Sequence, residues 1–252
     1  MTRSVKGIEA ARSAARTAAK TAKAATKGAK SGDDGRSTRW SAHREARRAE
    51  LVEAAVAAID QLGPTAGIED IASAAGVSKP VLYRYFSDKA DLHAAVGTWG
   101  AALVLERLMP ALVADGTLRE RVDLGCEAYL ALIEEHAGVF LLLVQHRVVS
   151  DVDPLADGKA AIAAAIARVM GDALRQPGVD SAGAEPWAYG LVGLGLSTGE
   201  WWLTRQTMSR SAVAGYLSSF VWHALEGISR SYGVSIDGEL RLVSPEEGTA
   251  GR

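Results

Sequence analysis

Residues 68–89, IEDIASAAGVSKPVLYRYFSDK, constrain the fold more than any other part of the chain. Their apolar spacing predicts two short helices, at residues 68–75 and 79–86. Gly76 supplies the positive φ that the Ala-Gly-Val-Ser connection needs. Ser78 is placed to cap the second helix through its hydroxyl, and Pro80 lies in the first turn, where its missing N–H costs nothing. So short a connection forces a steep crossing, which is the geometry of a helix-turn-helix.

The outward face of the second helix carries Lys79, Val81, Tyr83, Arg84 and Tyr85. A helix of this width fits the major groove of DNA, with its first residues nearest the base edges. Lys79 and Arg84 suit phosphate or guanine acceptors, the tyrosine hydroxyls suit phosphates, and Val81 suits a thymine methyl group. Core packing is the alternative for the aromatic residues: we expect it for Phe86 and leave it open for Tyr85.

The run G-V-S-K-P-V-L-Y-R-Y-F-S-D-K resembles the signature A-G-V-S-x-x-x-L-Y-x-Y/H-F-x-x-K of the TetR family of transcriptional regulators. The matching positions are Ala75, Gly76, Val77, Ser78, Leu82, Tyr83, Tyr85, Phe86 and Lys89, within a resemblance that covers residues 44–92. It implies phosphate contacts at Tyr83 and Lys89 and base contacts around Lys79. The family usually has Thr or Ser where this chain has Gly67, and Thr65 is the candidate replacement. The predicted DNA-binding residues are Arg47, Thr65, Ser78, Lys79, Pro80, Val81, Tyr83, Arg84, Tyr85 and Lys89.

Helical spacing continues beyond this motif, with little sign of strands. The expected helices are residues 42–62, 68–75, 79–86, 88–112, 117–136, 138–146, 154–174, 185–206 and 209–232, the fourth interrupted or ended near Pro110. About nine helices predict an all-α fold. The first three form a helix-turn-helix domain, and the resemblance implies that the rest form a ligand-binding and dimerisation domain. The predicted organisation is a basic arm (1–39), the helix-turn-helix domain (40–88), the effector-binding and dimerisation domain (89–235) and a loose tail (236–252).

The basic arm holds ten Lys and Arg against three acidic residues, a net charge of +7, whereas the rest of the chain carries −9. Such an arm can displace counterions from DNA phosphates. Its composition predicts disorder in isolation, and residues 31–38, rich in Gly, Ser and Asp, are expected to be a linker. Two interpretations stay open: phosphate contact that raises affinity without adding specificity, or a solubilising tail.

Several classes of protein are disfavoured by composition and motif context. The single cysteine, Cys126, excludes an intrachain disulfide and a multi-cysteine metal site, and fits a reducing compartment. The longest purely apolar run, residues 160–167, is too short to span a bilayer. The letters G-L-S-T-G at 195–199 lie inside a helical pattern, whereas a nucleophile elbow follows a strand. We expect no catalytic residue, cofactor or metal site, no membrane contact, and a cytoplasmic, nucleoid-associated protein.

The helical body offers candidates for an effector pocket and for a dimer face. The pocket candidates are Trp99, Leu103, Met109, Cys126, Tyr129, Phe140, Leu143, His146, Trp187 and Trp201, with Cys126, His136 and Gln145 as the groups that would orient a ligand. Ordinary core packing is the alternative for each. Four glycines within residues 185–206 each cost about 1 kcal/mol relative to alanine, so we expect close helix approach, within the protomer or across a dimer, or a bent helix. The dimer candidates are Gly195, Gly199, Trp202, Leu217, Phe220, Val221, Ala224 and Ile228.

Together these features predict a ligand-responsive, sequence-specific regulator. We expect a homodimeric repressor on double-stranded DNA, released from a palindromic operator by a small hydrophobic effector such as an acyl chain or an aromatic compound. The helix at 88–112 is the expected lever between the two domains. Two alternatives are a non-specific nucleoid-binding protein that relies on the arm, and an enzyme or carrier built on the helical body.

Overall fold

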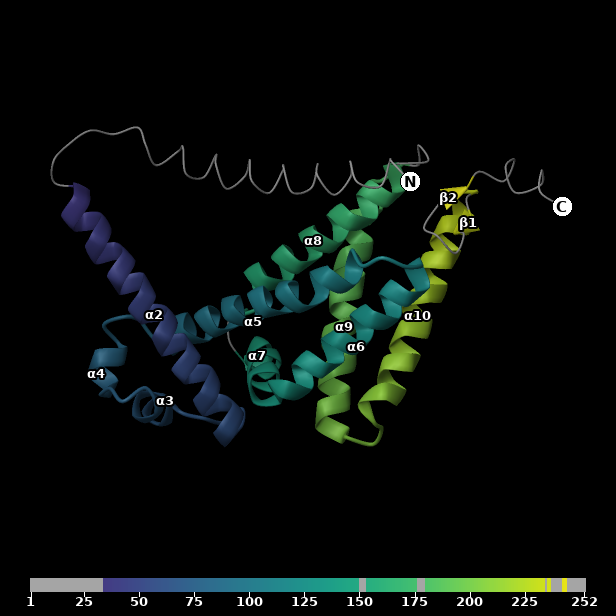
Figure 1. Ribbon diagram of the computed structural model, residues 1–252. Coiled ribbons are helices and arrows are strands. Elements are labelled where there is room, and N and C mark those ends of the chain that lie inside the picture. Colours follow the sequence, from purple (N-terminus) through teal and green to yellow (C-terminus); the bar gives the residue numbers. More distant parts are fainter. Residues whose placement is uncertain (1–33, 150–152, 176–179, 234, 237–241, 244–252) are drawn as a thin grey trace. The chain divides into compact units, whose positions relative to one another are not determined.

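The computed structural model describes residues 34–149, 153–175, 180–233, 235–236 and 242–243. These residues form nine helices and one pair of two-residue strands (Figure 1). The helices are α2 (Asp34–Leu62), α3 (Ile68–Ala74), α4 (Lys79–Leu82), α5 (Lys89–Leu112), α6 (Leu118–Glu135), α7 (Ala137–Val149), α8 (Ala156–Arg175), α9 (Ala184–Arg205) and α10 (Arg210–Ser231). The all-α prediction is confirmed, and most predicted helix ends lie within two residues of the observed ones.

Helix α2 begins at Asp34, eight residues before the predicted start. The linker expected at residues 31–38 is therefore wrong for residues 34–38, while most of the basic arm, residues 1–33, lies outside the described part of the chain. Once a helix is nucleated, each added residue gains a hydrogen bond at little further cost, so residues typical of turns can extend it. The described residues divide into two units after Arg47, and α2 runs from the first unit into the second.

The helix-turn-helix domain has a continuous core. Leu51 and Ile59 of α2, Ile71 of α3, and Leu82 and Phe86 of the α4 region are all buried in one cluster. The cluster extends beyond the motif into two further helices through Leu92, Val96, Val139, Leu142 and Leu143. Burial of these apolar side chains fixes the motif on α5 and α7.

Helix α5 joins the helix-turn-helix to the rest of the body. Its N-cap, Asp88, accepts a hydrogen bond from the backbone N–H of Asp91 at 2.8 Å. Pro110 lies inside the helix without ending it, since α5 continues to Leu112. The predicted interruption at Pro110 is therefore wrong, while the predicted end near Pro110 lies two residues before the observed end.

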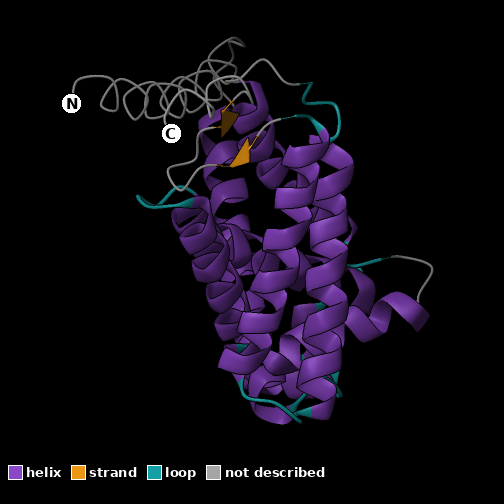
Figure 2. Ribbon diagram, turned by 90° about the vertical axis from the view of Figure 1, so that its right-hand side faces the viewer, coloured by secondary structure: helices purple, strands orange, loops and turns teal. Residues whose placement is uncertain are grey.

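The C-terminal domain is built from α5 to α10. Helix α5 packs on α6 and α8, α8 on α9, and α6 on α10. A second core cluster joins α6, α9 and α10 through residues that include Leu130, Ile133, Trp202 and Leu217. Figure 2 shows the long helices of this domain running beside one another, with the antiparallel strands β1 (Ser235–Ile236) and β2 (Leu242–Val243) near one end.

The glycines of α9 fall into two groups. A Cβ at Gly199 would lie 2.7 Å from Cδ1 of Ile133 and 2.9 Å from Cζ of Phe140, so α9 meets α6 and α7 here with no room for a side chain. A Cβ at Gly195 would be 3.5 Å from the Tyr129 ring. By contrast, nothing in the described residues lies within 4 Å of a Cβ at Gly190 or Gly193. Close approach within the protomer thus explains Gly199.

Candidate DNA-binding surface and ligand cavity

The turn of the helix-turn-helix follows the predicted chemistry with one difference. Gly76 has φ +64°, the left-handed conformation that glycine adopts most readily. Ser78 occupies the N-cap position of α4 with extended backbone, but its hydroxyl makes no capping hydrogen bond. The second helical residue is Pro80, which has no N–H, and the next N–H, of Val81, already bonds the Ser78 carbonyl at 2.9 Å. The predicted side-chain cap is therefore wrong, because the backbone replaces it.

The outward face of the α4 region presents the basic and tyrosine side chains that the sequence predicts. Lys79 and Arg84 are exposed, and the Tyr83 side chain is 40% exposed. Tyr85 is half-buried against the core, and Phe86 is fully buried, as expected. The helical part is shorter than predicted, since α4 ends at Leu82 and the following residues form tight turns.

Lys79 is held by a carboxylate of the neighbouring helix. Its Nζ donates to Oε1 of Glu69, on α3, at 3.0 Å. This hydrogen bond, with the accompanying charge attraction, raises the pKa of Lys79 above its ordinary value. Both side chains are well exposed, so a DNA phosphate or base can compete for the ammonium group.

Arg48 holds the helix-turn-helix against the neighbouring helices. The sequence analysis did not single out this residue. Its Nε donates to the Tyr85 carbonyl at 3.3 Å, and its guanidinium bonds Oδ1 of Asp91 at 2.5 Å. The guanidinium carbon also lies 4.5 Å from the centroid of the Phe86 ring. One side chain of α2 therefore ties the turns that follow α4 to the start of α5. The only sequence signal was the Arg pair at positions 47 and 48.

The remaining DNA-binding candidates lie at the edges of the motif. Gly67 is the N-cap of α3, and its backbone N–H donates to Oδ2 of Asp70 at 2.8 Å. Thr65 is exposed two residues before that cap, Lys89 is exposed at the first position of α5, and Arg47 lies on α2. The DNA contacts of Thr65, Lys89 and Arg47 remain predictions.

A cavity of about 280 Å³ lies inside the C-terminal domain. Its wall is almost wholly apolar and is formed by helices α5 to α10. Wall residues follow α5 from Gly97 to Leu112, and they follow α6 from Leu118 past its C-terminal end to His136. At a rise of about 1.5 Å per residue the wall on α5 extends over roughly 22 Å, so the cavity is elongated along the helices.

The predicted pocket residues divide between this cavity and other places. Those on its wall are Trp99, Leu103, Cys126, Tyr129, Phe140 and Leu143, together with His136. Met109, Trp187 and Trp201 are not among the wall residues, Trp187 packing edge-on against Tyr232 instead. Gln145 is exposed, and the side chain of His146 lies outside the described residues.

The sequence analysis did not predict that helix α8 forms part of the cavity wall. It contributes Ile162, Ile166, Val169 and Met170, and the last two follow Ile166 by three and four residues. This spacing is the signal that could have found them, although it predicts only an apolar helix face. Arg121, on α6, and Lys159, on α8, were missed as well.

Burial keeps two acidic groups of the wall in their neutral forms. Desolvation raises the pKa of the Cys126 thiol to about 12, and it also raises that of the Tyr129 hydroxyl above its ordinary value. The Tyr129 hydroxyl lies against α9, where a Cβ at Gly199 would be 3.0 Å away, and no described residue hydrogen-bonds to it. Neither group carries charge at neutral pH.

His136 connects the cavity wall to the helix-turn-helix. Its Nδ1 lies 2.7 Å from Oδ2 of Asp60, in the last turn of α2, and the Trp99 ring packs edge-on against the imidazole at 5.1 Å. A Cβ at Gly138 would lie 2.4 Å from the Ile59 carbonyl oxygen, so the start of α7 presses on the same turn. The imidazole and the indole both belong to the cavity wall.

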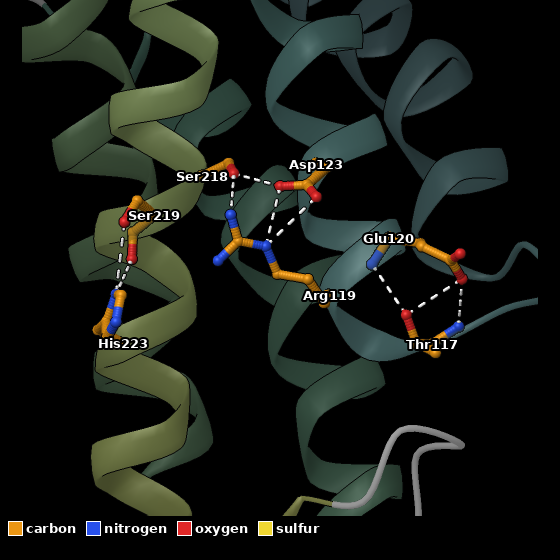
Figure 3. A network of polar contacts seen from close by, with 7 residues as sticks. All are labelled: Thr117, Arg119, Glu120, Asp123, Ser218, Ser219 and His223. Carbon is orange, nitrogen blue, oxygen red and sulfur yellow. Dashed lines mark hydrogen bonds and ion pairs between the residues drawn. The ribbon is translucent and has the colours of Figure 1, made fainter.

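A polar network joins α6 to α10 (Figure 3). Arg119 donates to Asp123 at 3.3 Å and to Oγ of Ser218 at 3.4 Å, and the Ser218 hydroxyl also donates to Asp123. Nearby, Thr117 and Glu120 form a capping box that begins α6, and the backbone N–H of Thr117 lowers the pKa of Glu120. The network fixes α6 against α10 beside one end of the cavity.

Helices α9 and α10 also carry an exposed apolar surface. Phe220 is 64% exposed and Tyr216 is 71% exposed, and with Trp201 and Met208 they line a groove between the two helices. Among the predicted dimer residues, Phe220 and Ala224 are exposed and Ile228 is half-buried. The others are turned into the protomer: Trp202 and Gly199 are buried, and Gly195, Leu217 and Val221 line the cavity.

Comparison with known proteins places this architecture in a family. The profile described as bacterial regulatory proteins of the tetR family matches residues 51–96, and a tetracyclin repressor-like C-terminal domain profile matches residues 107–234. The chain belongs to the TetR family and is a helix-turn-helix transcriptional regulator.

Similar proteins include curated relatives and solved structures. An uncharacterized HTH-type transcriptional regulator of Mycobacterium tuberculosis is 33% identical over 79% of this chain and 86% of its own length. The transcriptional activator FasR of Mycolicibacterium smegmatis is 31% identical over 73% and 85%. A Streptomyces coelicolor TetR-family structure has a TM-score of 0.61 at 22% identity, covering 82% and 95%. FadR of Bacillus subtilis, in complex with stearoyl-CoA, has a TM-score of 0.55 at 16% identity, covering 68% and 96%.

Within the described residues, no helix is both long and apolar enough to cross a membrane.

Proposed function

We propose that the protein is a homodimeric repressor that binds a palindromic operator and leaves it when a small hydrophobic effector occupies the cavity. The observation that carries this proposal is the position of His136. The imidazole forms part of the cavity wall and hydrogen-bonds to Asp60, at the end of the first helix of the DNA-binding domain. A ligand that displaces this side chain acts directly on that domain.

The wall of the cavity selects the class of effector. Its surface is almost entirely aliphatic or aromatic carbon, so an apolar ligand gains by leaving water. Its elongation along α5 favours a chain over a compact molecule. The stearoyl-CoA bound by the Bacillus subtilis FadR structure supports a long acyl chain as the first candidate.

Linkage sets the direction of the response. An effector that releases DNA must bind the DNA-free conformation more tightly, typically by about 1–3 kcal/mol of coupling. Helix α5 and the contact of His136 with Asp60 are the two routes through which that preference reaches the motif. Activation is the second candidate, since the FasR relative is named as an activator.

The test begins with a selection of genomic fragments bound by the purified full-length protein, followed by footprinting. We expect an inverted repeat, and we expect octadecanoyl-CoA or a related acyl compound to weaken binding. An operator affinity that stays unchanged across all tested apolar compounds would rule out induction by ligand. A footprint on a single half-site would rule out the palindromic operator.

Two variants separate this function from its rivals. Substitution of Tyr83→Ala or Lys79→Ala should weaken operator binding roughly ten- to hundredfold, whereas an enzyme or carrier built on the helical body would keep its activity. Deletion of residues 1–33 should leave operator choice intact and flatten the salt dependence of binding. A nucleoid-binding protein that relies on the basic arm would lose DNA binding altogether.

A further inference from the structure

Five polar side chains line the otherwise apolar cavity: Arg121, Cys126, Tyr129, His136 and Lys159. None of the wall residues described is a carboxylate. The wall therefore carries two full positive charges, on Arg121 and Lys159, and no negative one. A charge beside an apolar cavity is costly unless a partner of opposite charge compensates it.

Four of these five groups are already engaged or neutral. Lys159 is ion-paired with Asp153, and His136 is bonded to Asp60. The thiol of Cys126 is neutral, and the hydroxyl of Tyr129 lies against α9. None of the four offers an uncompensated charge to a ligand.

Arg121 differs from the other four. Its Nε is buried without a hydrogen-bond partner among the described residues, and one Nη atom makes a long hydrogen bond of 3.5 Å to the Leu112 carbonyl. No carboxylate of the described residues pairs with it. Arg119, two residues earlier on α6, points instead into the network with Asp123 and Ser218 (Figure 3).

Arg121 and Lys159 lie at opposite ends of the cavity. Arg121 reaches Leu112, the last residue of α5. Lys159 follows Gly158, whose position packs against Gly97 and Ala101, at the end of the cavity wall on α5 that lies farther from Leu112. Fifteen residues of α5, or roughly 22 Å, separate Leu112 from Gly97. A linear ligand along this path has one end at an unpaired guanidinium and the other at a neutralised ammonium.

We propose that Arg121 binds the anionic end of the effector, which is a straight aliphatic chain ending in a carboxylate. This inference rests on the proposed function, since it concerns the same cavity, and it adds the polarity and direction of the ligand. A planar guanidinium bonds a carboxylate through parallel N–H groups, and Nε–H is one of the donors used in such pairs. The apolar tail then follows α5 toward Trp99 and His136.

The experiment compares an acid with the matching alcohol. Binding of tetradecanoate, 1-tetradecanol and tetradecanoyl-CoA to the full-length protein is measured through tryptophan fluorescence and calorimetry. We expect tetradecanoate to bind at least about tenfold more tightly than the alcohol, because a hydrogen bond to a charged group is lost with the alcohol. Arg121→Gln should remove this preference while leaving the affinity for the alcohol unchanged, and Arg121→Lys should keep part of it.

Lys159→Gln is the matched control, because it removes the other cation of the wall. We expect it to keep the preference for the acid. Equal binding of acid and alcohol by the wild type, a preference that survives in Arg121→Gln, or its loss in Lys159→Gln would each overturn the proposal. The proposal would also be overturned if tetradecanoyl-CoA bound more tightly than tetradecanoate and its affinity did not change in Arg121→Gln.

Operator release by the same compounds distinguishes this inference from the proposed function. If 1-tetradecanol releases DNA as well as the acid does, the cavity is an effector site and the role of Arg121 is refuted. If no compound alters operator affinity in any variant, the proposed function fails together with the inference.

Discussion

The contact between Lys79 and Glu69 places a carboxylate beside the side chain predicted to read bases. Glu69 lies in the first turn of α3, on the motif that approaches a polyanion, and it is strongly exposed. It must therefore weaken DNA binding twice, by repelling phosphates and by competing for the Lys79 ammonium group.

Glu69→Gln should raise operator affinity a few-fold and should steepen the dependence of log Kd on log salt concentration by about one. Fluorescence anisotropy over a salt series measures both quantities. A cycle with Lys79→Ala supplies the control, since most of the gain should vanish when Lys79 is absent. A gain of equal size in that background would show that Glu69 acts through phosphate repulsion alone.

Two neighbouring aromatic residues show that the sequence pattern does not predict which side chains of α9 are buried. Trp201 and Trp202 follow one another on α9, and the sequence analysis assigned Trp201 to the pocket and Trp202 to the dimer face. In the structure Trp202 is 4% exposed, with its Nε1 donating to the Met208 carbonyl at 3.0 Å, while Trp201 lies on the surface. Adjacent residues on a helix point about 100° apart, and apolar residues occur on both faces of α9. The pattern therefore cannot decide which face is inside.

The helix-turn-helix was predictable because its determinants are local. Gly76, Pro80 and the spacing of Ile71, Leu82 and Phe86 act within a short stretch of chain. The cavity depends instead on which helices pack together. The proposed role of Arg121 follows only from its lack of an ion pair with any described carboxylate, which no spacing along α6 reveals.

At the scale of elements, the packing of α9 against α6 and α7 depends on Gly199. Gly199→Ala should lower the free energy of unfolding by about 1–2 kcal/mol, since overpacking of about 1–3 kcal/mol exceeds the helix propensity gained. Gly195→Ala, one turn earlier, meets the Tyr129 ring only at 3.5 Å and should be neutral or stabilising by up to about 1 kcal/mol.

Urea unfolding of the two variants under one set of conditions measures the difference. The comparison is matched, because both substitutions add one methyl group to the same helix near Tyr129. Equal stabilities, or a more stable Gly199→Ala, would contradict the close approach of these helices.

The contact between α2 and the cavity wall makes a second element-scale prediction. Asp60→Ala removes the hydrogen bond to His136 and frees the last turn of α2 from the start of α7. Hydrogen exchange should then quicken at the Gly63 amide, which donates to the Ile59 carbonyl, and in the first turn of α7.

Gln61→Ala is the control for this prediction, because its side chain is exposed on the same turn. We expect exchange in that variant to match the wild type. Exchange rates that are unchanged in Asp60→Ala would show that apolar packing alone, through Val139, Leu142 and Leu143, holds the motif on the body.

At the scale of the whole molecule, the exposed surface on α9 and α10 is the face that we propose for the dimer. Aromatic rings at Tyr189, Trp201, Tyr216 and Phe220 occupy the solvent side of these helices. A standard interface buries about 800 Å² on each partner. These partly exposed rings account for only part of that area, so neighbouring residues of the two helices must also be buried. The small residues between them, such as Gly193 and Gly215, would allow close contact across a two-fold axis, and nothing described in the protomer packs on either.

The proposed dimer would make the helix-turn-helix specific. Two motifs held about 34 Å apart would read successive major grooves, so each protomer would strengthen the binding of the other through effective concentration. Because a two-fold interface repeats each contact, Phe220→Glu introduces two buried charges per dimer. We expect this variant to be monomeric in light scattering and to lose at least about a hundredfold in operator affinity, while its helix content and its binding of tetradecanoate stay unchanged. Leu124→Glu, a control at an exposed leucine on α6, should remain dimeric. A Phe220→Glu protein that is still dimeric and still binds the full operator would place the interface elsewhere, and the exposed rings of α9 and α10 would then need another partner.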